Sequence, residues 1–380
     1  MSRKIKILHI QQSISFGGVE RRRLSLAKHL DKSLFEQKLI CTSHRGDMIE
    51  EIRNAGVEVF EIGNLNSPFH WSQHKKVQKV IDDYKPDIIH GAVFEGVTMA
   101  AINGWYKKVP FIIIEETSDP KNRSWRGHFL MKLFSKIADR VVGVSKSVTD
   151  EYLTHQLKIS SKKVTLINNG VALPREVSNT EVSEAKIKWG IGEGDFVIGS
   201  TGRMLLDSHK RFSDLIKAFA KFAEQKKDVK LLLIGDGPEK EGYEKLATEL
   251  DISDKIIFTT YQSDVTLYYK MMDVFSLVSS REAFGLVLAE AMLNQLPVVA
   301  TKVGGMKYIV DDRETGFLVN PYQTDEIAEK FELLYNDKNL CETLGRQGRQ
   351  KALSEFTEEN YTKRIEKLYL ELTKNYNEIN

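Results

Sequence analysis

Short apolar segments alternate with amphipathic helical segments along most of this 380-residue chain. In the first half, the apolar segments lie at residues 5–10, 35–41, 57–62, 87–90, 111–115 and 140–145. Helical patterns separate most of these segments, and strands that alternate with helices form a parallel, doubly wound sheet. The alternation therefore predicts an α/β fold, because strands buried on both faces need helices to cover them.

The alternation stops near residue 170 and then restarts, which divides the chain into two parts. The stretch 174–184 is polar and irregular, and it is the best candidate for a linker. Beyond it, strands are predicted at 196–201, 230–235, 256–258, 274–277 and 297–300. Because 380 residues exceed one ordinary core, we predict two domains. Their expected boundaries are 1–172 and 191–355, with a linker at 173–190 and a helical C-terminal segment at 356–380.

Composition excludes several classes of protein. Hydrophobic residues make up 41% and charged residues 28% of the chain, as in soluble globular proteins. No apolar run approaches the ~20 residues that a membrane-spanning helix requires, and the N-terminus lacks the core of a signal peptide. The two cysteines, Cys41 and Cys341, indicate neither a disulfide framework nor a zinc cluster. We expect a cytoplasmic protein.

Charge is unevenly distributed along the chain. Residues 1–170 hold 27 Lys and Arg against 18 Asp and Glu, an excess of nine positive charges. The remainder holds 28 of the 55 basic residues and 35 of the 53 acidic ones, an excess of seven negative charges. A basic first half suggests an anionic partner, such as a membrane surface or a phosphate-bearing acceptor. Uneven solvated surfaces without any partner would give the same count.

A predicted helix at residues 125–137 admits two interpretations. Its apolar positions are Phe129, Leu130, Leu133, Phe134 and Ile137, and its basic positions include Arg126, Lys132 and Lys136. A basic amphipathic helix with aromatic residues can lie on an anionic membrane. A helix that covers a parallel sheet also needs a broad apolar face, and packing is the interpretation that we favour.

Two carboxylates in the second half stand eight positions apart, at Glu282 and Glu290, with Gly285 between them. Eight residues span a little over two helical turns, so Glu290 can lie on a helix while Glu282 lies on the preceding loop. Gly285 falls where the helix should begin and lets an anion approach unpaired backbone N–H groups. This arrangement suits a nucleotide-linked sugar, although an ordinary strand–loop–helix connection with two solvated glutamates would also explain it.

Other polar residues follow predicted strands, where ligands bind in open α/β sheets. Gly202 and Arg203 follow one strand, and Lys210 precedes the next helix, so two cations could hold a diphosphate there. Gln262 follows another strand and could line a pocket for a base. The chain has no Asp-x-Asp pair and no His or Cys spacing typical of metal sites, so we expect no metal and no cofactor.

A glycine pair, Gly17-Gly18, lies between the first strand and the first helix. Glycine at this point permits the backbone to lie close to a ligand. The dinucleotide-binding spacing G-x-G-x-x-G is absent, so a nicotinamide or flavin cofactor is not indicated. A plain tight turn is the alternative.

Taken in order, these motifs resemble the retaining GT-B glycosyltransferases of family four, also called glycosyl transferases group 1. In the second half, the segments similar to the family's nucleotide-sugar-binding domain are 202–203, Lys210, 235–238, 261–265, 280–285, 290–291, 297–301 and 315–319. In the first half, the similar segments are 17–20, 86–90, 138–145 and 169–171. The resemblance thus covers nearly the whole chain.

The resemblance implies two Rossmann-like domains that face a central cleft, with the C-terminal helix crossing back to the first domain. It also implies catalytic and donor-binding roles for four side chains. Glu282 would bind hydroxyls of the donor sugar, and Glu290 would bind those of the ribose. Arg203 and Lys210 would neutralise the diphosphate.

The resemblance further implies that backbone groups contact the donor. The N–H groups of Phe284, Gly285 and Leu286 would face the sugar and the phosphates. Gly17-Gly18 would approach the phosphates from the opposite domain.

The chain departs from the family's pattern at two positions. Family members commonly carry a histidine after the strand that corresponds to 111–114, and Glu116 aligns with it here. Glu116 is therefore a candidate acceptor base or sugar ligand. Glu115 and His90 are neighbouring acceptor-side candidates, although a satisfied strand-end histidine also explains His90. Thr260 stands where a glycine usually precedes the base-contacting residue, which leaves the nucleobase open.

These observations predict a metal-independent, retaining glycosyltransferase. It would move a hexose or N-acetylhexosamine from a nucleoside-diphosphate sugar, with UDP favoured and GDP possible, to an acceptor hydroxyl. The expected acceptor is a lipid-linked saccharide at the cytoplasmic face of the membrane, in surface polysaccharide or glycoconjugate synthesis. No nucleic-acid partner is expected. A nucleotide-sugar epimerase and a non-catalytic partner subunit of the same fold are the alternatives.

Overall fold

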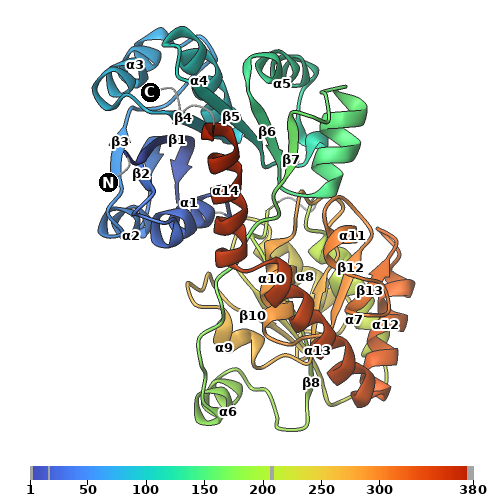
Figure 1. The fold of residues 1–380 in the computed structure, drawn as a ribbon. Coiled ribbons are helices and arrows are strands. Elements are labelled where there is room, and N and C mark those ends of the chain that lie inside the picture. The colour runs from blue at the N-terminus through green and yellow to red at the C-terminus, as the bar shows by residue number, and fades with distance from the viewer. Residues whose placement is uncertain (1–2, 16–17, 206–208, 375–380) are drawn as a thin grey trace. The chain divides into compact units, whose positions relative to one another are not determined.

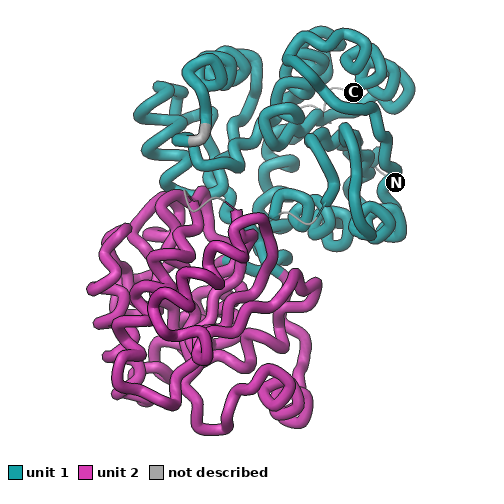
Figure 2. The backbone as a smooth tube through the Cα atoms, turned by 180° about the vertical axis from the view of Figure 1, so that it is seen from behind, with its two compact units in different colours: residues 1–171, 356–380 teal, residues 172–355 magenta. Residues whose placement is uncertain are grey.

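The computed structural model describes residues 3–15, 18–205 and 209–374. These residues form two compact units, shown in different colours in Figure 2. Unit 1 contains Met1–Val171 together with Phe356–Asn380, and unit 2 contains Ala172–Glu355. The chain thus leaves unit 1 once and returns to it with its last helix (Figure 1).

The described residues of unit 1 form a seven-stranded parallel sheet in the order β3-β2-β1-β4-β5-β6-β7 (Figure 1). The strands are β1 (Ile5–Ile14), β2 (Phe35–His44), β3 (Glu58–Glu61), β4 (Ile88–Ala92), β5 (Phe111–Glu116), β6 (Arg140–Gly143) and β7 (Val164–Leu166). The chain runs outward from β1 to β3 and then returns to β4 beside β1. The strand order therefore reverses between β1 and β4, and ligands of doubly wound sheets bind at such a point.

Helices cover the sheet of unit 1. They are α1 (Gly18–His29), α2 (Met48–Asn54), α3 (Trp71–Tyr84), α4 (Val93–Tyr106), η1 (Pro120–Asn122), α5 (Trp125–Ile137), the π-helical η2 (Ser147–Gln156) and α14 (Glu358–Thr373). Helix α4 lies directly on β1, because a Cβ at Gly96 would come within 2.4 Å of the carbonyl oxygen of Ile10. Helix α14 inserts Tyr361, Ile365 and Tyr369 into the core of unit 1, where all three side chains are fully buried.

The described residues of unit 2 form a six-stranded parallel sheet in the order β10-β9-β8-β11-β12-β13. The strands are β8 (Phe196–Thr201), β9 (Val229–Ile234), β10 (Ile256–Phe258), β11 (Val274–Leu277), β12 (Val298–Thr301) and β13 (Gly316–Val319). The helices are α6 (Asn179–Lys188), α7 (Phe212–Phe222), α8 (Lys240–Glu249), α9 (Thr266–Tyr269), α10 (Leu286–Leu293), α11 (Met306–Ile309), α12 (Thr324–Asn336) and α13 (Lys338–Glu355). The prediction of two doubly wound, parallel-sheet domains is confirmed.

The stretch 174–184 was predicted to be irregular, and this is wrong for its second half. Helix α6 begins at Asn179, because the Ser178 side chain accepts a hydrogen bond from the Glu181 N–H while the Glu181 side chain accepts one from the Ser178 N–H. This reciprocal capping box stabilises a helix start even where the sequence is polar. The spacing Ser-x-x-Glu was the signal in the sequence that composition alone did not show.

Among the described residues, no helix combines the length and the hydrophobicity needed to cross a membrane.

Candidate functional site

An ion pair joins two of the predicted donor-site residues of unit 2. The Lys210 Nζ donates to the Glu282 Oε2 over 2.7 Å, although the residues lie 72 positions apart. The two side chains remain 29% and 19% exposed, so a ligand can reach both. The structure thus brings together the ammonium expected to hold the diphosphate and the carboxylate expected to hold the sugar.

Backbone contacts fix the positions of these two residues. The Ser280 N–H donates to the carbonyl oxygen of His209 over 2.7 Å, which holds the loop before Glu282 beside the loop that carries Lys210. The Gly305 N–H donates to the carbonyl oxygen of Glu282 over 2.9 Å.

The segment after β12 comes so close to Glu282 that only glycine fits. A Cβ at Gly304 would lie 1.9 Å from the Glu282 carbonyl oxygen, and the φ of Gly304 is +49°. Gly304-Gly305 was not predicted as part of the site, although a glycine pair soon after a strand was a signal for close approach.

Helix α10 begins directly after Gly285, whose φ of 103° and ψ of 57° lie in the left-handed region that favours glycine. The Phe284 side chain before it is buried in unit 2, with 3% exposed. The backbone of the loop is therefore anchored immediately before the first turn of the helix. The N–H groups of a first turn have no intrahelical partner, and a negative charge is stabilised there.

Glu290 lies on the second turn of α10, where the Tyr269 hydroxyl donates to its Oε2 over 2.9 Å. Tyr269 is 1% exposed, so this hydrogen bond holds the carboxylate from the protein side. Sequence analysis missed Tyr269, because the residue lies on the short helix α9 outside any of the motifs.

The loops after β8 and β9 contact each other beside this site. A Cβ at Gly235 would lie 2.0 Å from the carbonyl oxygen of Gly202, and the Met204 N–H donates to the carbonyl oxygen of Asp236 over 2.9 Å. The side chain of Lys210 passes over Gly202, with its Cε 3.7 Å from where a Cβ would be.

Two further predicted donor residues of unit 2, Arg203 and Gln262, are not part of this ion pair. Arg203 is exposed, and Gln262 is half-buried with its amide 3.5 Å from the carbonyl oxygen of Thr260. Gly18 starts α1 in unit 1, and Gly17 lies outside the described residues.

In unit 1, the carboxylate of Glu116 accepts hydrogen bonds from other residues of the protein. The Arg123 Nη2 donates to both of its oxygens, over 2.8 and 2.6 Å, and the Ser118 N–H donates to its Oε1 over 3.2 Å. The carboxylate is 1% exposed, and the guanidinium carbon of Arg123 lies 4.7 Å from the centre of the Phe94 ring. Arg123 was not recognised in the sequence.

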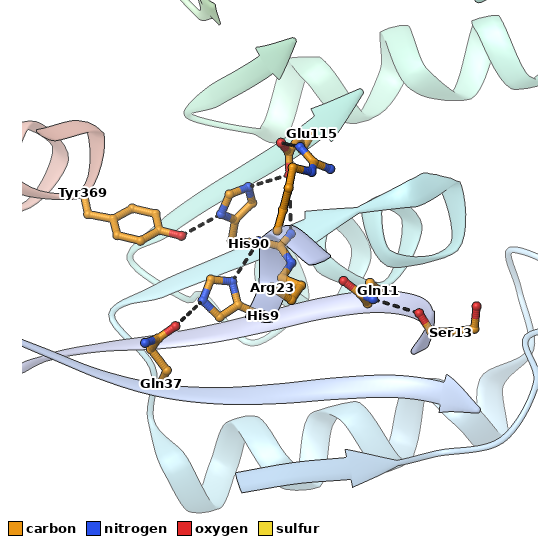
Figure 3. Close-up of polar contacts among 9 residues, drawn as sticks. His9, Gln11, Ser13, Arg23, Gln37, His90, Glu115 and Tyr369 are labelled. Carbon is orange, nitrogen blue, oxygen red and sulfur yellow. Dashed lines mark hydrogen bonds and ion pairs between the residues drawn. The ribbon is translucent and has the colours of Figure 1, made fainter. Parts of the chain in front are cut away.

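His90 and Glu115 belong to a buried polar cluster between α1, α14 and the sheet of unit 1 (Figure 3). The Arg22 Nη1 donates to the Glu115 Oε1, and the Arg23 Nη2 lies 3.5 Å from its Oε2. His90 presents its Nε2 to the same carboxylate over 3.6 Å, and its Nδ1 lies 2.7 Å from the Tyr369 hydroxyl. The exposed fractions of these side chains are all 3% or less.

A second arm of the cluster reaches β1 and β2. The Arg23 Nη1 donates to the His9 Nδ1 over 3.2 Å, so the proton of a neutral His9 lies on Nε2, which faces the Gln37 Oε1 at 3.2 Å. The Gln37 amide donates in turn to the carbonyl oxygen of Leu26 over 3.0 Å. Helix α1 is therefore held at three points on one face, Arg22, Arg23 and Leu26.

Burial and the charge of Arg23 hold the pKa of His9 well below its usual range, and they lower the pKa of His90 to about 4. Burial by itself would raise the pKa of Glu115, but the charges of Arg22 and Arg23 outweigh it and hold that pKa well below its usual range. At neutral pH the cluster thus contains two guanidinium ions, one carboxylate and two neutral imidazoles, with one positive charge in excess.

The burial of His90 and Glu115 argues against direct contact with an acceptor. Both side chains point at protein partners, and neither reaches the surface of unit 1. The alternative of a satisfied strand-end histidine fits only in part, because His90 lies in the middle of β4 and its buried Nε2 has no partner within hydrogen-bond distance. The three consecutive arginines 21–23 on one helix were the overlooked signal, since a helix with one buried face cannot expose all three.

Among the described residues, no group of three or more His, Cys, Asp or Glu side chains is arranged to hold a metal ion.

Two family models match the chain. The model described as "Glycosyl transferases group 1" matches residues 181–351, and the model described as "Glycosyltransferase Family 4" matches residues 16–175. Together they cover most of both units.

The chain is also similar to curated proteins. It is 31% identical over 235 residues to N-acetyl-alpha-D-glucosaminyl L-malate synthase of Bacillus anthracis, a match covering 62% of this chain and 60% of that protein. It is 31% identical over 252 residues to the capsular polysaccharide biosynthesis glycosyltransferase CapM of Staphylococcus aureus, covering 64% and 65%. The matches span less than two thirds of the length of either relative.

Solved structures share the fold over nearly the full length. HepE of Anabaena in complex with UDP superimposes with a TM-score of 0.84 at 22% identity, covering 96% of this chain and 99% of that one. A glycosyltransferase of Rickettsia africae superimposes with a TM-score of 0.86 at 21% identity, covering 98% and 99%. At these sequence identities, the structural similarity shows that the fold is shared.

Proposed function

Because the chain belongs to the GT-B glycosyltransferases of group 1 and family 4, we propose that it transfers a sugar from a nucleotide-sugar donor to an acceptor hydroxyl. The observation that carries the proposal is the Lys210–Glu282 ion pair beside the start of α10. In the proposed complex, the Lys210 ammonium and the N-terminus of α10 bind the diphosphate of the donor, and the Glu282 carboxylate binds hydroxyls of its sugar.

The ion pair has a direct consequence for donor binding. Without a donor, Lys210 and Glu282 neutralise each other over 2.7 Å. A diphosphate carries more negative charge than one carboxylate, so it draws the ammonium toward itself. Glu282 is then released to accept hydrogen bonds from sugar hydroxyls, while Glu290, oriented by Tyr269, accepts those of the ribose.

In the proposed reaction, the bond between the anomeric carbon and the diphosphate oxygen breaks, and its electron pair stays on the phosphate. The acceptor oxygen forms the new bond to the same face of the sugar, so the anomeric configuration is retained. The acceptor proton passes to the departing phosphate oxygen. Arg203, Lys210 and the start of α10 stabilise the charge that develops on that phosphate, and the proposed mechanism requires no metal.

The proposed donor is a UDP-hexose or UDP-N-acetylhexosamine, with a GDP-sugar as the alternative. HepE, which shares the fold, has been solved with UDP and with UDP-glucose. The proposed acceptor is a lipid-linked saccharide in surface polysaccharide or glycoconjugate synthesis, at the cytoplasmic face of the membrane. The name of CapM and the excess of nine positive charges in residues 1–170 support this acceptor.

The test is a screen of UDP- and GDP-sugars by thermal shift, followed by transfer assays with the sugars that bind. A donor at 100 times its Kd should stabilise the protein by about 2.7 kcal/mol. Lys210→Ala should abolish the shift, whereas Lys217→Ala, which removes an exposed lysine of α7, should keep it. If no nucleotide sugar shifts the wild type, or if Lys210→Ala binds as well, the proposed donor site is wrong.

A non-catalytic partner subunit is the second candidate, because Glu116 replaces the family's histidine and is tied to Arg123. Such a protein would bind a donor but neither hydrolyse nor transfer its sugar. The transfer assay separates the two candidates, since donor turnover by the wild type excludes a purely structural role.

A further inference from the structure

Helix α5 exposes large apolar side chains on the surface of unit 1. Trp125 is 73%, Phe129 is 61% and Leu133 is 44% exposed. The favoured interpretation of this helix as a sheet-covering element is therefore wrong for Phe129 and Leu133, which sheet packing would bury. The packing side consists instead of Gly127, Met131, Phe134 and Ser135, which are buried.

The exposed side of α5 combines these apolar residues with basic ones. Arg126, Lys132 and Lys136 are exposed, and the Arg126 guanidinium lies 5.4 Å from the centre of the Trp125 ring. At 3.6 residues per turn, the three apolar and three basic residues occupy an arc of about 120° of the helix. Lys132 and Arg126 lie at the two edges of the arc, and Lys136 lies between Trp125 and Phe129.

The end of α4 continues this surface. Trp105 is 65% and Tyr106 is 62% exposed, and the exposed Lys108 follows them. A groove of about 480 Å³ lies between the end of α4 and the last turn of α5, with Trp105, Tyr106 and Ile137 among its lining residues. Helices α4 and α5 pack side by side (Figure 1). We call this set of residues on α4 and α5 the α4–α5 surface.

The charge of the α4–α5 surface is mainly positive, because Asp139, the acidic residue that lines the groove, is half-buried and accepts a hydrogen bond from the Ile112 N–H. Residues 104–110 and 120–138 contain seven Lys and Arg and no Asp or Glu, in a chain whose net charge is only +2. Of these seven, Lys108, Lys121, Arg126, Lys132 and Lys136 are exposed, and Lys121 lies on η1, shortly before α5. Five large apolar side chains left in water together with five cations are complementary to an anionic surface that also has an apolar interior.

We propose that the α4–α5 surface docks unit 1 on an anionic lipid bilayer. Trp125, Phe129 and Leu133 enter the boundary between headgroups and acyl chains, and the lysines extend toward the lipid phosphates. The benefit of such docking rests on the proposed function, because docking would bring the enzyme to a lipid-linked acceptor.

A second exposed aromatic pair in unit 1 shows what sets this surface apart. Phe69 and Trp71 at the start of α3 are 60% and 57% exposed, much like Phe129 and Trp125. Residues 62–74 around them contain no Asp, Glu, Lys or Arg. The exposed Lys75 and Lys76 follow on α3, so this region has similar apolar area with fewer cations, and the pair provides a control at a separate site.

The test is flotation of the full chain with vesicles at low salt, with no donor or acceptor present. The wild type should float with vesicles of equal parts phosphatidylglycerol and phosphatidylcholine, and it should stay behind with phosphatidylcholine alone. Lys132→Gln/Lys136→Gln should lower the partition coefficient roughly 25-fold, at about fivefold for each basic residue near the surface. Trp125→Ala/Phe129→Ala should lower it at least about tenfold.

The control variant Phe69→Ala/Trp71→Ala should float like the wild type. All variants change exposed side chains, so unfolding temperatures equal to that of the wild type should show that each one is folded. Absence of wild-type flotation with anionic vesicles, equal flotation with neutral ones, or an equal loss in the control variant would each overturn the proposal. Because flotation requires no turnover, this result and the transfer assay fail independently.

Discussion

Acidification should destabilise unit 1 through His90. Burial and the charge of Arg23 lower the pKa of His90 in the folded protein to about 4, against 6.5 for a free imidazole. Below pH 6.5 the unfolded chain binds a proton at this histidine that the folded chain does not bind. The stability that the neutral imidazole contributes is therefore fully present above pH 6.5, is lost progressively as the pH falls, and stops changing near pH 4.

The size of this loss follows from the two pKa values. A difference of one pKa unit corresponds to 1.36 kcal/mol, so the step from pH 7.5 to pH 5 costs about 2 kcal/mol of unfolding free energy through His90. His9, whose pKa is also lowered by burial, adds a loss of the same sign. Glu115, whose pKa is lowered as well, contributes stability that is lost only below its unfolded pKa of about 4.3.

The assay is urea unfolding at both pH values, followed by tryptophan fluorescence, since three of the four tryptophans lie in unit 1. His90→Asn keeps an acceptor for the Tyr369 hydroxyl but does not titrate, so its loss on acidification should be about 2 kcal/mol smaller than that of the wild type. His155→Asn, at an exposed position, is the matched control. Equal acid losses for His90→Asn and the wild type would refute the reasoning.

Three further substitutions test the ionic cluster and the donor site. Glu115→Gln removes the carboxylate that faces two buried guanidinium ions and should lower the unfolding free energy by about 3–5 kcal/mol in urea titrations; a change below about 1 kcal/mol would contradict this. Gly304→Ala places a Cβ within 1.9 Å of the Glu282 carbonyl oxygen and should displace that residue, so donor affinity should fall at least about tenfold in calorimetry. Tyr269→Phe removes the hydrogen bond to Glu290 and should weaken UDP binding about tenfold, whereas unchanged affinity would show that this carboxylate needs no support.

Sequence reasoning worked best in unit 2, where the predicted site is local. Glu282, Gly285 and Glu290 lie within nine residues, so helical periodicity and the need for glycine at a helix start were enough to arrange them. The contact with Lys210 was also within reach, because the carboxyl ends of parallel strands share one edge of a sheet. The close contact between Gly304 and the Glu282 carbonyl oxygen was not predicted, because only the packed structure shows which loop lies against that carbonyl.

In unit 1 the same reasoning did not find the protein partners of His90 and Glu115. Both residues lie on the predicted strands, Glu115 near the end of β5 and His90 in the middle of β4. The alternation of side chains along a strand does not reveal what covers each face. Arg22 and Arg23 on α1 cover the face that Glu115 occupies, and Tyr369 of α14 covers His90. These partners are 92 to 279 residues away in sequence, and no local pattern connects them.

We interpret the buried cluster as a set of contacts that fixes the position of α1. Replacing buried ions by apolar side chains of similar volume is often neutral or stabilising, so stability alone does not account for two guanidinium ions at 1% and 3% exposure. Hydrogen bonds and ion pairs depend on direction, so they fix the rotation of the helix about its axis and its position along that axis. Arg22 and Arg23 point 100° apart, and each must reach its own partner. The cluster therefore holds the second turn of α1 in one place relative to His9 of β1 and Glu115 of β5.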